Sequence, residues 1–403
     1  MTQPRKPPEF ATRMQRVQSS AVRDLLKHSK TPGMISLAGG IPASDLFDLE
    51  GLGAIIAGLD ARADAGIFQY SETEGERGLR AAIATLLAAR GIAAKPDNVL
   101  VTSGSQQGLD LAARILLSPG DRIILERPSY LAALQTFGLA EAQVVTAPSD
   151  GDGMDVGWVE DYVARQPVKA IYVVPDFGNP SGATLSLERR RRLVELAGRT
   201  GTVLLEDDPY GALRFAGAPL PSLQALAAAA GVHEQVIYLS SFSKILAPGL
   251  RIGWMVLSDA AFRQAALAKQ AIDLHSSSLS QHIVAAYLAS GRLGPRLQVL
   301  REGYRQRRDA LMGALRERLG DAIAFGEPAG GMFLWARFGE AVDSARVLAH
   351  GIEQGVVFVP GAAFYAEHPE HNTLRLSYSM ITPAAAHEAA ERLARALAAA
   401  AGE

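Results

Sequence analysis

The chain has 403 residues, of which 48% are hydrophobic, so it is long enough to bury a large core. Its 40 basic and 42 acidic residues leave a formal charge of −2, which gives no electrostatic reason to expect nucleic acid or an anionic membrane as a partner. The absence of cysteine excludes disulfides, thiolate catalysis and cysteine-bound metals. The N-terminus does not resemble a signal peptide, and no uncharged apolar run reaches the roughly 20 residues that cross a bilayer, so we expect a cytoplasmic protein.

The N-terminal 50 residues are expected to form an arm followed by a segment that joins the C-terminal part of the chain. Residues 1–18 are proline-rich and basic, which predicts a mobile arm. The sequence SSAVRDLLKHS fits a short helix that carries Arg23 on its polar face. The rest of segment 19–50 predicts a strand and a glycine-proline turn that complete a smaller α/β unit with residues 291–403.

Residues 51–290 are predicted to form a larger domain, in which strands alternate with helices from about residue 97. Its expected strands are the apolar runs NVLVT, RIILE, AQVVTA, AIYVVP, TVLLED, VIYLSS and RIGWMVL. Helices lie between several of them, and the four arginines of SLERRRRLVELAGRT are expected to form a solvated helix face. This alternation predicts a mainly parallel sheet covered on both faces, with its site at the carboxyl ends of the strands.

The C-terminal part has a different pattern. A long charged helix is predicted from Arg296 to about Leu319, and GGMFLWARF and NTLRLSYS alternate as half-exposed strands do. An alanine-rich helix closes the chain after Thr382-Pro383.

No nucleotide-binding or metal-binding motif is present. The chain lacks GxGxxG after a strand, the P-loop pattern, HExxH and a carboxylate-rich loop, and its eight histidines are scattered. We therefore expect no metal site.

A lysine and an arginine share the turn SSFSKILAPGLR after the run VIYLSS. Lys244 and Arg251 lie close in this turn, and two like charges are unfavourable there unless an anion joins them. A second anion grip is predicted at Gly104-Ser105-Gln106, which opens the helix after NVLVT, although Ser105 alone also fits a simple helix cap.

Three other polar residues follow predicted strands. Tyr130 comes after RIILE, Asn179 lies in the turn PDFGNPSG, and Asp207 ends TVLLED beside Asp208. Each alone fits packing, turn formation or ion pairing. An aromatic ring, an amide and a buried acid would thus lie near a lysine and two anion-binding sites. This combination is typical of a site for pyridoxal phosphate.

These motifs resemble the fold-type I pyridoxal-phosphate enzymes of aminotransferase class I/II, most of all the group with 2-aminoadipate and kynurenine aminotransferases. The landmarks run from about Ser19 to the C-terminal helix and are ISLAGGIP, YSETEGERGLR, VTSGSQQGLDL, RPSY, NPSG, EDDPYG, SFSKILAPGLRIGW and LRLSYS. The resemblance implies a large domain with a mainly parallel seven-stranded sheet, and a smaller α/β domain built from both termini.

The resemblance also implies roles for individual residues in the cofactor site. Lys244 would form the Schiff base and move the proton, with a pKa lowered by a dry site and by Arg251. Asp207 would pair with the pyridinium nitrogen, and Tyr130, the third residue assigned to catalysis, would stack on the ring. Hydrogen bonds to the ring's phenolic oxygen are expected from Asn179 and Tyr210. The rest of the cofactor-binding set is Gly104, Ser105, Gln106, Ser241, Ser243 and Arg251, chiefly around the phosphate.

For the substrate, the resemblance assigns the α-carboxylate to Arg375, close to the backbone at Gly40, with Asn179 nearby. Arg23 occupies the position at which enzymes of this group bind the distal carboxylate of the substrate. The alternative is that Arg23 is only a solvated surface charge. Tyr70 matches a tyrosine that reaches the neighbouring subunit's cofactor, so the resemblance implies a homodimer with shared sites.

The expected reaction is transfer of an amino group between 2-oxoglutarate and a second amino acid, which is 2-aminoadipate, an aromatic or a large aliphatic one. A lyase, decarboxylase or racemase on this scaffold would keep Lys244 and Asp207, and spacing does not separate these reactions. A further alternative is the effector-sensing part of a transcription regulator. We expect this least, because the roughly 30 residues before the family-like part are too few for a DNA-binding domain.

Overall fold

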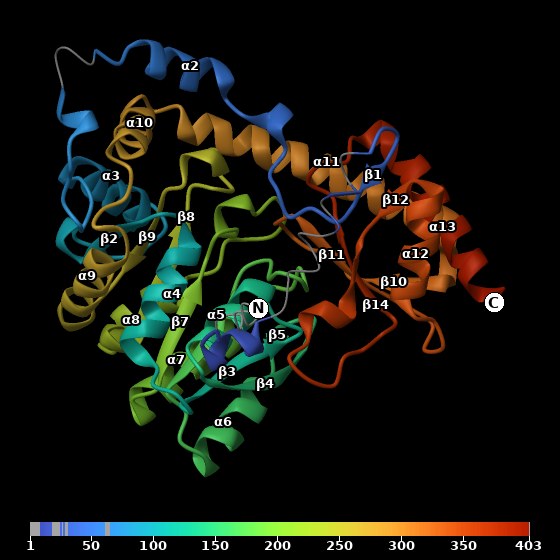
Figure 1. Cartoon of the computed structure of the whole chain (residues 1–403), viewed down its shortest axis with the longest axis horizontal. Helices are drawn as coiled ribbons and strands as arrows, with labels where there is room; N and C mark the ends of the chain where they lie inside the picture. The colour runs from blue at the N-terminus through green and yellow to red at the C-terminus, as the bar shows by residue number, and fades with distance from the viewer. Residues whose placement is uncertain (1–8, 18–24, 26, 29–30, 61–64, 403) are drawn as a thin grey trace, which may run out of the picture.

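The computed structural model describes residues 9–17, 25, 27–28, 31–60 and 65–402 (Figure 1). The predicted N-terminal helix falls largely outside these residues, and so does Arg23. Within the described chain, no helix is long and apolar enough to cross a membrane.

The central sheet of the larger part has eight strands in the order β2-β9-β8-β7-β6-β3-β4-β5. Six strands run in the same direction, whereas β9 is antiparallel to both its neighbours and β5 to β4. The predicted mainly parallel sheet is confirmed, and the seven predicted runs all form strands. The eighth strand, β5, has only two residues. The bounds are β2 Val99–Thr102, β3 Arg122–Arg127, β4 Gln143–Asp150, β5 Gly153–Met154, β6 Ala170–Val173, β7 Val203–Asp207, β8 Val236–Ser241 and β9 Gly253–Val256.

Helices cover both faces of this sheet because its strands are apolar on both sides. Along β3, Ile123 and Leu125 pack in one core with the helices α4 and α5, whereas Ile124 packs in a second core with α6, α7 and α8. Figure 1 shows α4 in front of the strands and α7 and α8 behind them. The helices around the sheet are α3 Arg77–Ala88, α4 Ser105–Leu116, α5 Leu131–Leu139, α6 Val156–Arg165, α7 Leu187–Thr200, α8 Leu223–Ala229, α9 Asp259–Asp273 and α10 Ser278–Ala289.

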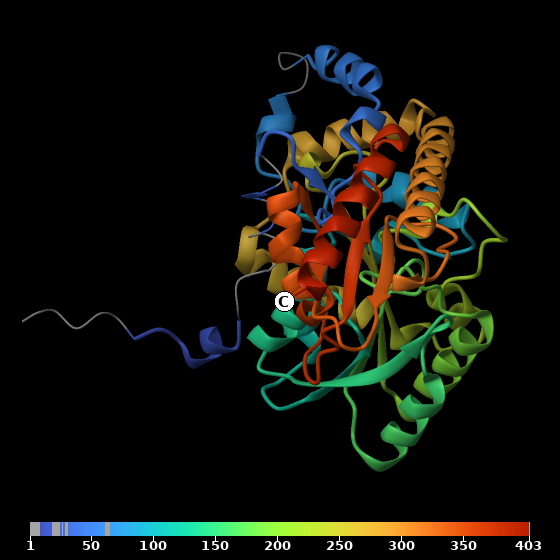
Figure 2. The same ribbon diagram turned by 90° about the vertical axis from the view of Figure 1, so that its right-hand side faces the viewer.

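The smaller part is built around an antiparallel sheet in the order β10-β11-β14-β13. Helix α11 (Leu293–Leu319) leads into it from α10, and α12 (Ser344–Gln354) and α13 (Ala386–Ala401) pack beside it (Figures 1 and 2). The N-terminal segment contributes β1 (Ile35–Ser36), which pairs in parallel with β12 (Val356–Val357). The other strands are β10 Ile323–Phe325, β11 Phe333–Phe338, β13 Val359–Pro360 and β14 Thr373–Ser377. The division of the chain near residues 50 and 290 stays a prediction.

Two expectations about exposure are wrong. All five residues of β14 are buried, so NTLRLSYS is not half-exposed. Its leucines pack in the main core, while the other side of the strand, with Arg375, faces the rings of Phe333 and Phe364. The arginine run of α7 is not wholly solvated either. Arg190 is fully buried, where it pairs with Asp176 at 2.9 Å.

Candidate active site

The turn after β8 carries Lys244 at the carboxyl edge of the large sheet. Ser241, the last residue of β8, shapes the start of this turn by accepting a hydrogen bond from the Ser243 backbone N–H at 3.0 Å. The Lys244 amine donates to the Gly40 carbonyl at 2.8 Å. Burial, and then the charges of Arg375 and Arg251, lower the pKa of Lys244 to about 8. A substantial fraction of this amine is therefore neutral near pH 8 and able to react.

The N-terminus of α4 and Arg251 of the Lys244 turn form an anion-binding site. Gly104 is the N-cap of α4 with φ of 88°, and no side chain caps this helix, so its first N–H groups remain available. Arg251 donates to the Ser103 carbonyl at 3.0 Å, and a Cβ on Gly104 would lie 2.5 Å from its guanidinium. Gly253 is equally confined, because a Cβ there would lie 2.7 Å from the Ser105 nitrogen. Backbone donors and a cation thus converge where Ser105, Gln106 and the serines after β8 were predicted to hold the phosphate.

Asp207 ends β7 as a buried carboxyl group with one free oxygen. Its Oδ2 accepts a hydrogen bond from the Tyr172 hydroxyl at 2.9 Å, whereas Oδ1 is buried and has no partner among the described residues. Burial, with a smaller contribution from the charge of Asp208, raises the pKa of Asp207 to about 7. The sequence suggested that one of these adjacent acids must face a cation. It is Asp208, which pairs with Arg90 at 2.7 Å.

The substrate side of the site is formed by Arg375 and Asn179. Arg375 is 2% exposed and donates to the Asn179 side-chain oxygen at 2.8 Å and to the Ala38 carbonyl at 2.6 Å, whereas its Nε is buried without a partner. Its guanidinium lies 4.5 Å from the Phe333 ring centre and 5.0 Å from that of Phe364. Burial lowers the pKa of Arg375 to about 10, so an anion is needed to stabilise its charge.

Tyr130 and Tyr210 also belong to this buried cluster. Tyr130 precedes α5. Burial, and then the charge of Asp207, raises its pKa to about 12, whereas the charges of Arg375 and Arg251 act to lower it. Tyr210 is 5% exposed, bonds to the Asn179 side chain and packs edge-on against Phe333. Its pKa is raised by burial.

Two predicted residues are not part of this cluster. Tyr70 is 78% exposed on the surface, where it packs edge-on against His275. Arg23 lies outside the described residues. Gly40, in contrast, lies beside Lys244, and a Cβ on it would approach the Phe333 ring within 3.1 Å.

Several residues of the site had no local signal in the sequence. Tyr172 lies in the middle of an apolar strand and reaches Asp207 only because β6 and β7 are neighbours in the sheet. The Phe333 and Phe364 rings around Arg375 come from two other segments of the small domain. In the described residues, no cluster of three or more His, Cys, Asp or Glu side chains is arranged to hold a metal ion.

The unsatisfied groups of the cluster fit pyridoxal phosphate and an amino acid. Lys244, Arg251 and Arg375 have no carboxylate within 4.0 Å among the described residues, although they lie in one site. A phosphate dianion and a substrate carboxylate supply the missing negative charge. The free Oδ1 of Asp207 is an acceptor for a buried N–H, as a protonated pyridine ring provides.

Residues 42–393 match the profile of the family described as aminotransferase class I and II. The chain belongs to this family. It is 39% identical to aromatic-amino-acid aminotransferase 1 of Thermococcus litoralis over 96% of this chain and 93% of that protein. Two solved structures each have a TM-score of 0.91. One is the α-aminoadipate aminotransferase of Thermus thermophilus complexed with N-(5′-phosphopyridoxyl)-L-leucine, with 37% identity and 98% of each chain covered. The other is the kynurenine aminotransferase of Pyrococcus horikoshii, in complex with PMP, with 38% identity and 97% of each chain covered.

The resemblance stated from the sequence is thereby confirmed. The chain is a pyridoxal-phosphate-dependent aminotransferase, similar to enzymes that act on aminoadipate, aromatic and other amino acids. The fold is the two-part α/β fold of these enzymes.

Proposed function

We propose that this aminotransferase moves the α-amino group of 2-aminoadipate, an aromatic or a large aliphatic amino acid to 2-oxoglutarate. The observation that carries the proposal is the meeting of Lys244, Asp207 and Arg375 in one buried site, with an unpartnered oxygen on the acid and an unpartnered Nε on the arginine. These are the groups that bind, protonate and orient an amino acid beside an electron-withdrawing ring.

When bound, pyridoxal phosphate supplies an aldehyde that takes up the amino group and a ring that withdraws electrons from the substrate Cα. Lys244 would hold this group, and its amine would take the substrate Cα proton and return it. Its pKa of about 8 suits both steps, because the amine loses and regains a proton at little cost near that pH. Asp207 holds a proton on the ring nitrogen through its free Oδ1.

Arg375 holds the substrate α-carboxylate, and its fixed orientation decides which Cα bond faces Lys244. Its contacts with Asn179 and Ala38 leave the guanidinium little freedom, and the Phe333 and Phe364 rings exclude water beside it. The α4 N-terminus and Arg251 bind the phosphate, with Ser105, Gln106, Ser241 and Ser243 as additional donors. Tyr130 would pack on the ring, and Tyr210 would act with Asn179 on the ring's phenolic oxygen.

The second subunit belongs to this proposal. The exposed apolar side chains Phe68 (65%), Tyr70 (78%), Ile272 (42%) and Leu274 (41%) come from two segments joined by the contact between Tyr70 and His275. A homodimer that buries this surface would carry Tyr70 to the neighbouring site.

The choice of amino donor is proposed from the activities of the relatives and from Arg23, which lies outside the described residues. A screen of amino donors against 2-oxoglutarate, which follows both the new 2-oxo acid and the glutamate, tests it. Equal amounts of the two products support transamination, whereas a 2-oxo acid, an amine or an inverted amino acid formed without glutamate contradicts it. If Arg23 reads a distal carboxylate, Arg23→Ala raises KM for 2-aminoadipate and leaves KM for aromatic donors unchanged; equal changes contradict that role.

A further inference from the structure

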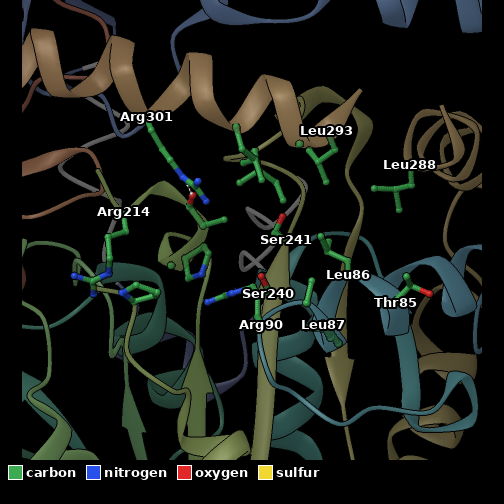
Figure 3. Close-up of a pocket in the computed structure, with 18 of the residues that line it drawn as sticks. Thr85, Leu86, Leu87, Arg90, Arg214, Ser240, Ser241, Leu288, Leu293 and Arg301 are labelled. Atoms are coloured by element: carbon green, nitrogen blue, oxygen red, sulfur yellow. Dashed lines mark hydrogen bonds between the residues drawn. The ribbon is translucent and has the colours of Figure 1, made fainter. Parts of the chain in front are cut away.

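A large pocket of about 1600 Å³ lies on the other side of β8 from the Lys244 site. Helices α3, α10 and α11 and the loop from Pro209 to Ser222 surround it, and Ser240 and Ser241 of β8 form part of its floor (Figure 3). Neither Lys244 nor Asp207 lines it, nor does Arg375. Its volume exceeds the roughly 300–1,000 Å³ that is usual for small-molecule sites. The pocket therefore adjoins the active site at Ser241 but does not include its central residues.

The walls of the pocket are mainly apolar. Each surrounding element contributes small or aliphatic side chains, which leave an open space rather than a packed contact. They include Ala82 and Leu86 of α3, Ala286 and Leu288 of α10, Leu293 and Leu297 of α11, and Pro219 and Leu220 of the loop. Such a wall binds the apolar body of a ligand.

Four arginines line the pocket, and three of them have carboxylate partners. Arg90 pairs with Asp208 at 2.7 Å, Arg214 with Asp176 at 2.7 Å, and Arg305 with Glu302 at 2.7 Å. Each of these charges is therefore already neutralised by the protein.

The fourth arginine, Arg301, has no carboxylate within 4.0 Å among the described residues. It is half-buried and uses its Nε to donate to the Ala212 carbonyl at 2.8 Å, and both terminal nitrogens have no hydrogen-bond partner among the residues that the structure describes. Figure 3 shows it reaching from α11 into the pocket above Arg90. Burial and the charge of Arg90 lower the pKa of Arg301. An anion placed between the two guanidiniums would relieve both effects.

We propose that this pocket is a second ligand site, which binds a small organic anion with an apolar body, such as an aliphatic or aromatic carboxylate. The carboxylate binds the terminal nitrogens of Arg301, and the body lies between α3, α10 and α11. The ligand sits directly behind the strand that carries the Lys244 turn.

Two other occupants fit the structure less well. The described part of the N-terminal arm, with η1 (Thr12–Arg16), packs beside α5 rather than beside any helix of the pocket (Figure 2). The exposed apolar side chains suited to a second copy, Phe68, Tyr70, Ile272 and Leu274, do not line the pocket. A small anion matches Arg301, which among the described lining arginines is the one without a carboxylate partner, within an apolar wall.

The test uses the purified holoenzyme and two matched probes. Anilinonaphthalenesulfonate has an apolar body and one anionic group, and N-phenylnaphthylamine has a similar body without the charge. Binding is followed by fluorescence titration, with the stoichiometry taken from equilibrium dialysis. Arg301→Gln removes the charge, Ala286→Trp fills the pocket, and Arg305→Gln removes a charge that is already paired, as the control.

We expect one anionic probe per chain, with affinity reduced about 10–100-fold in Arg301→Gln and unchanged in Arg305→Gln, since hydrogen bonds to charged groups contribute about 1.5–3 kcal/mol. The neutral probe keeps its affinity in Arg301→Gln, which shows that the pocket is intact, and both probes are excluded by Ala286→Trp. Equal anionic-probe affinity in the wild type and Arg301→Gln overturns the proposal. Dissociation of the oligomer in Ala286→Trp also overturns the proposal, because it would show that a second chain rather than a small anion occupies the pocket.

Discussion

Asp207 and Asp208 are neighbours in the chain, yet they face opposite sides of the sheet edge and meet very different surroundings. Asp208 is satisfied by the protein itself: it accepts from Arg90 at 2.7 Å, from the Tyr238 hydroxyl at 2.8 Å and from the Gly211 N–H at 2.8 Å. Asp207 has a single partner, Tyr172, and a buried oxygen without one. The difference separates a structural acid from one that awaits a ligand.

The same contrast applies to the cations. Arg190 and Arg90 are buried or half-buried against carboxylates of their own chain, whereas Lys244, Arg251 and Arg375 meet in one site without any within 4.0 Å among the described residues. Arg375 is buried and Lys244 is half-buried, and a fold does not keep such charges unpaired for its own stability, because each costs free energy. Their concentration on one side of the sheet edge therefore marks the side where cofactor and substrate bind.

The largest difference between the two acids is expected when Asp207 and Asp208 are each replaced by asparagine. Asp207→Asn should lower kcat by about 10²–10³-fold, because it removes a charge placed to stabilise the reacting ring. It should also raise the stability of the apoenzyme. Burial raises the pKa of Asp207 from 3.8 in the unfolded chain to about 7, so its ionised form destabilises the fold at neutral pH, and the amide removes that cost.

Asp208→Asn is the matched control. It leaves Arg90 without its partner and should lower the free energy of unfolding by about 1–3 kcal/mol, with a much smaller loss of kcat. Denaturant unfolding and steady-state kinetics on both variants measure the pair. Equal losses of kcat in the two variants would contradict the separation of roles.

A second, smaller effect is expected at the substrate arginine. Arg375→Lys replaces a planar fork by a point charge and should lower kcat/KM for amino acids about 10–100-fold, because it weakens charge-assisted hydrogen bonds to the α-carboxylate. The control is Arg337→Lys on β11, where the exposed arginine pairs with Glu370 and no change is expected. A change of similar size in both variants would remove Arg375 from the substrate site.

The smallest expected effect is a shift in the pH midpoint for uptake of pyridoxal phosphate by the apoenzyme. Lys244 reacts only as the neutral amine, and its pKa of about 8 lies below the ordinary 10.5. The rate at which apoenzyme takes up pyridoxal phosphate should therefore rise about tenfold per pH unit below pH 8 and level off above it. Because the Asp207 charge raises the pKa of Lys244, Asp207→Asn should move this midpoint to lower pH. A midpoint near 10.5, or one that Asp207→Asn moves upward, would contradict the account; stopped-flow absorbance measures it.

Much of the fold was predictable because its strands are continuous apolar runs with polar residues at their carboxyl ends. VIYLSS forms β8 over the predicted residues, and TVLLED ends at Asp207 as expected. The anion grip at Gly104 and the lysine turn were also visible, since glycine, serine and cationic residues gather within short segments.

The remaining features depend on contacts between distant segments. Nothing near Arg190 in its arginine run indicates that this one side chain is buried against Asp176. The alternation of NTLRLSYS predicts one polar face, but that face meets aromatic rings and the substrate arginine rather than water. The pairing of Asp208 with Arg90 and the lack of a carboxylate partner for Arg301 among the described residues follow from how α3 and α11 pack against the sheet edge, which no local pattern records.

The central claim is that the amine of Lys244 is the group that joins the cofactor. Reduction of the holoenzyme with borohydride, followed by digestion and mass spectrometry, locates the lysine that carries the pyridoxyl group. The account predicts that the label lies on Lys244 alone and disappears in Lys244→Ala, together with the visible absorption band of the bound cofactor. A label on another lysine, such as the buried Lys269, or a Lys244→Ala enzyme that transaminates at the wild-type rate, would contradict it.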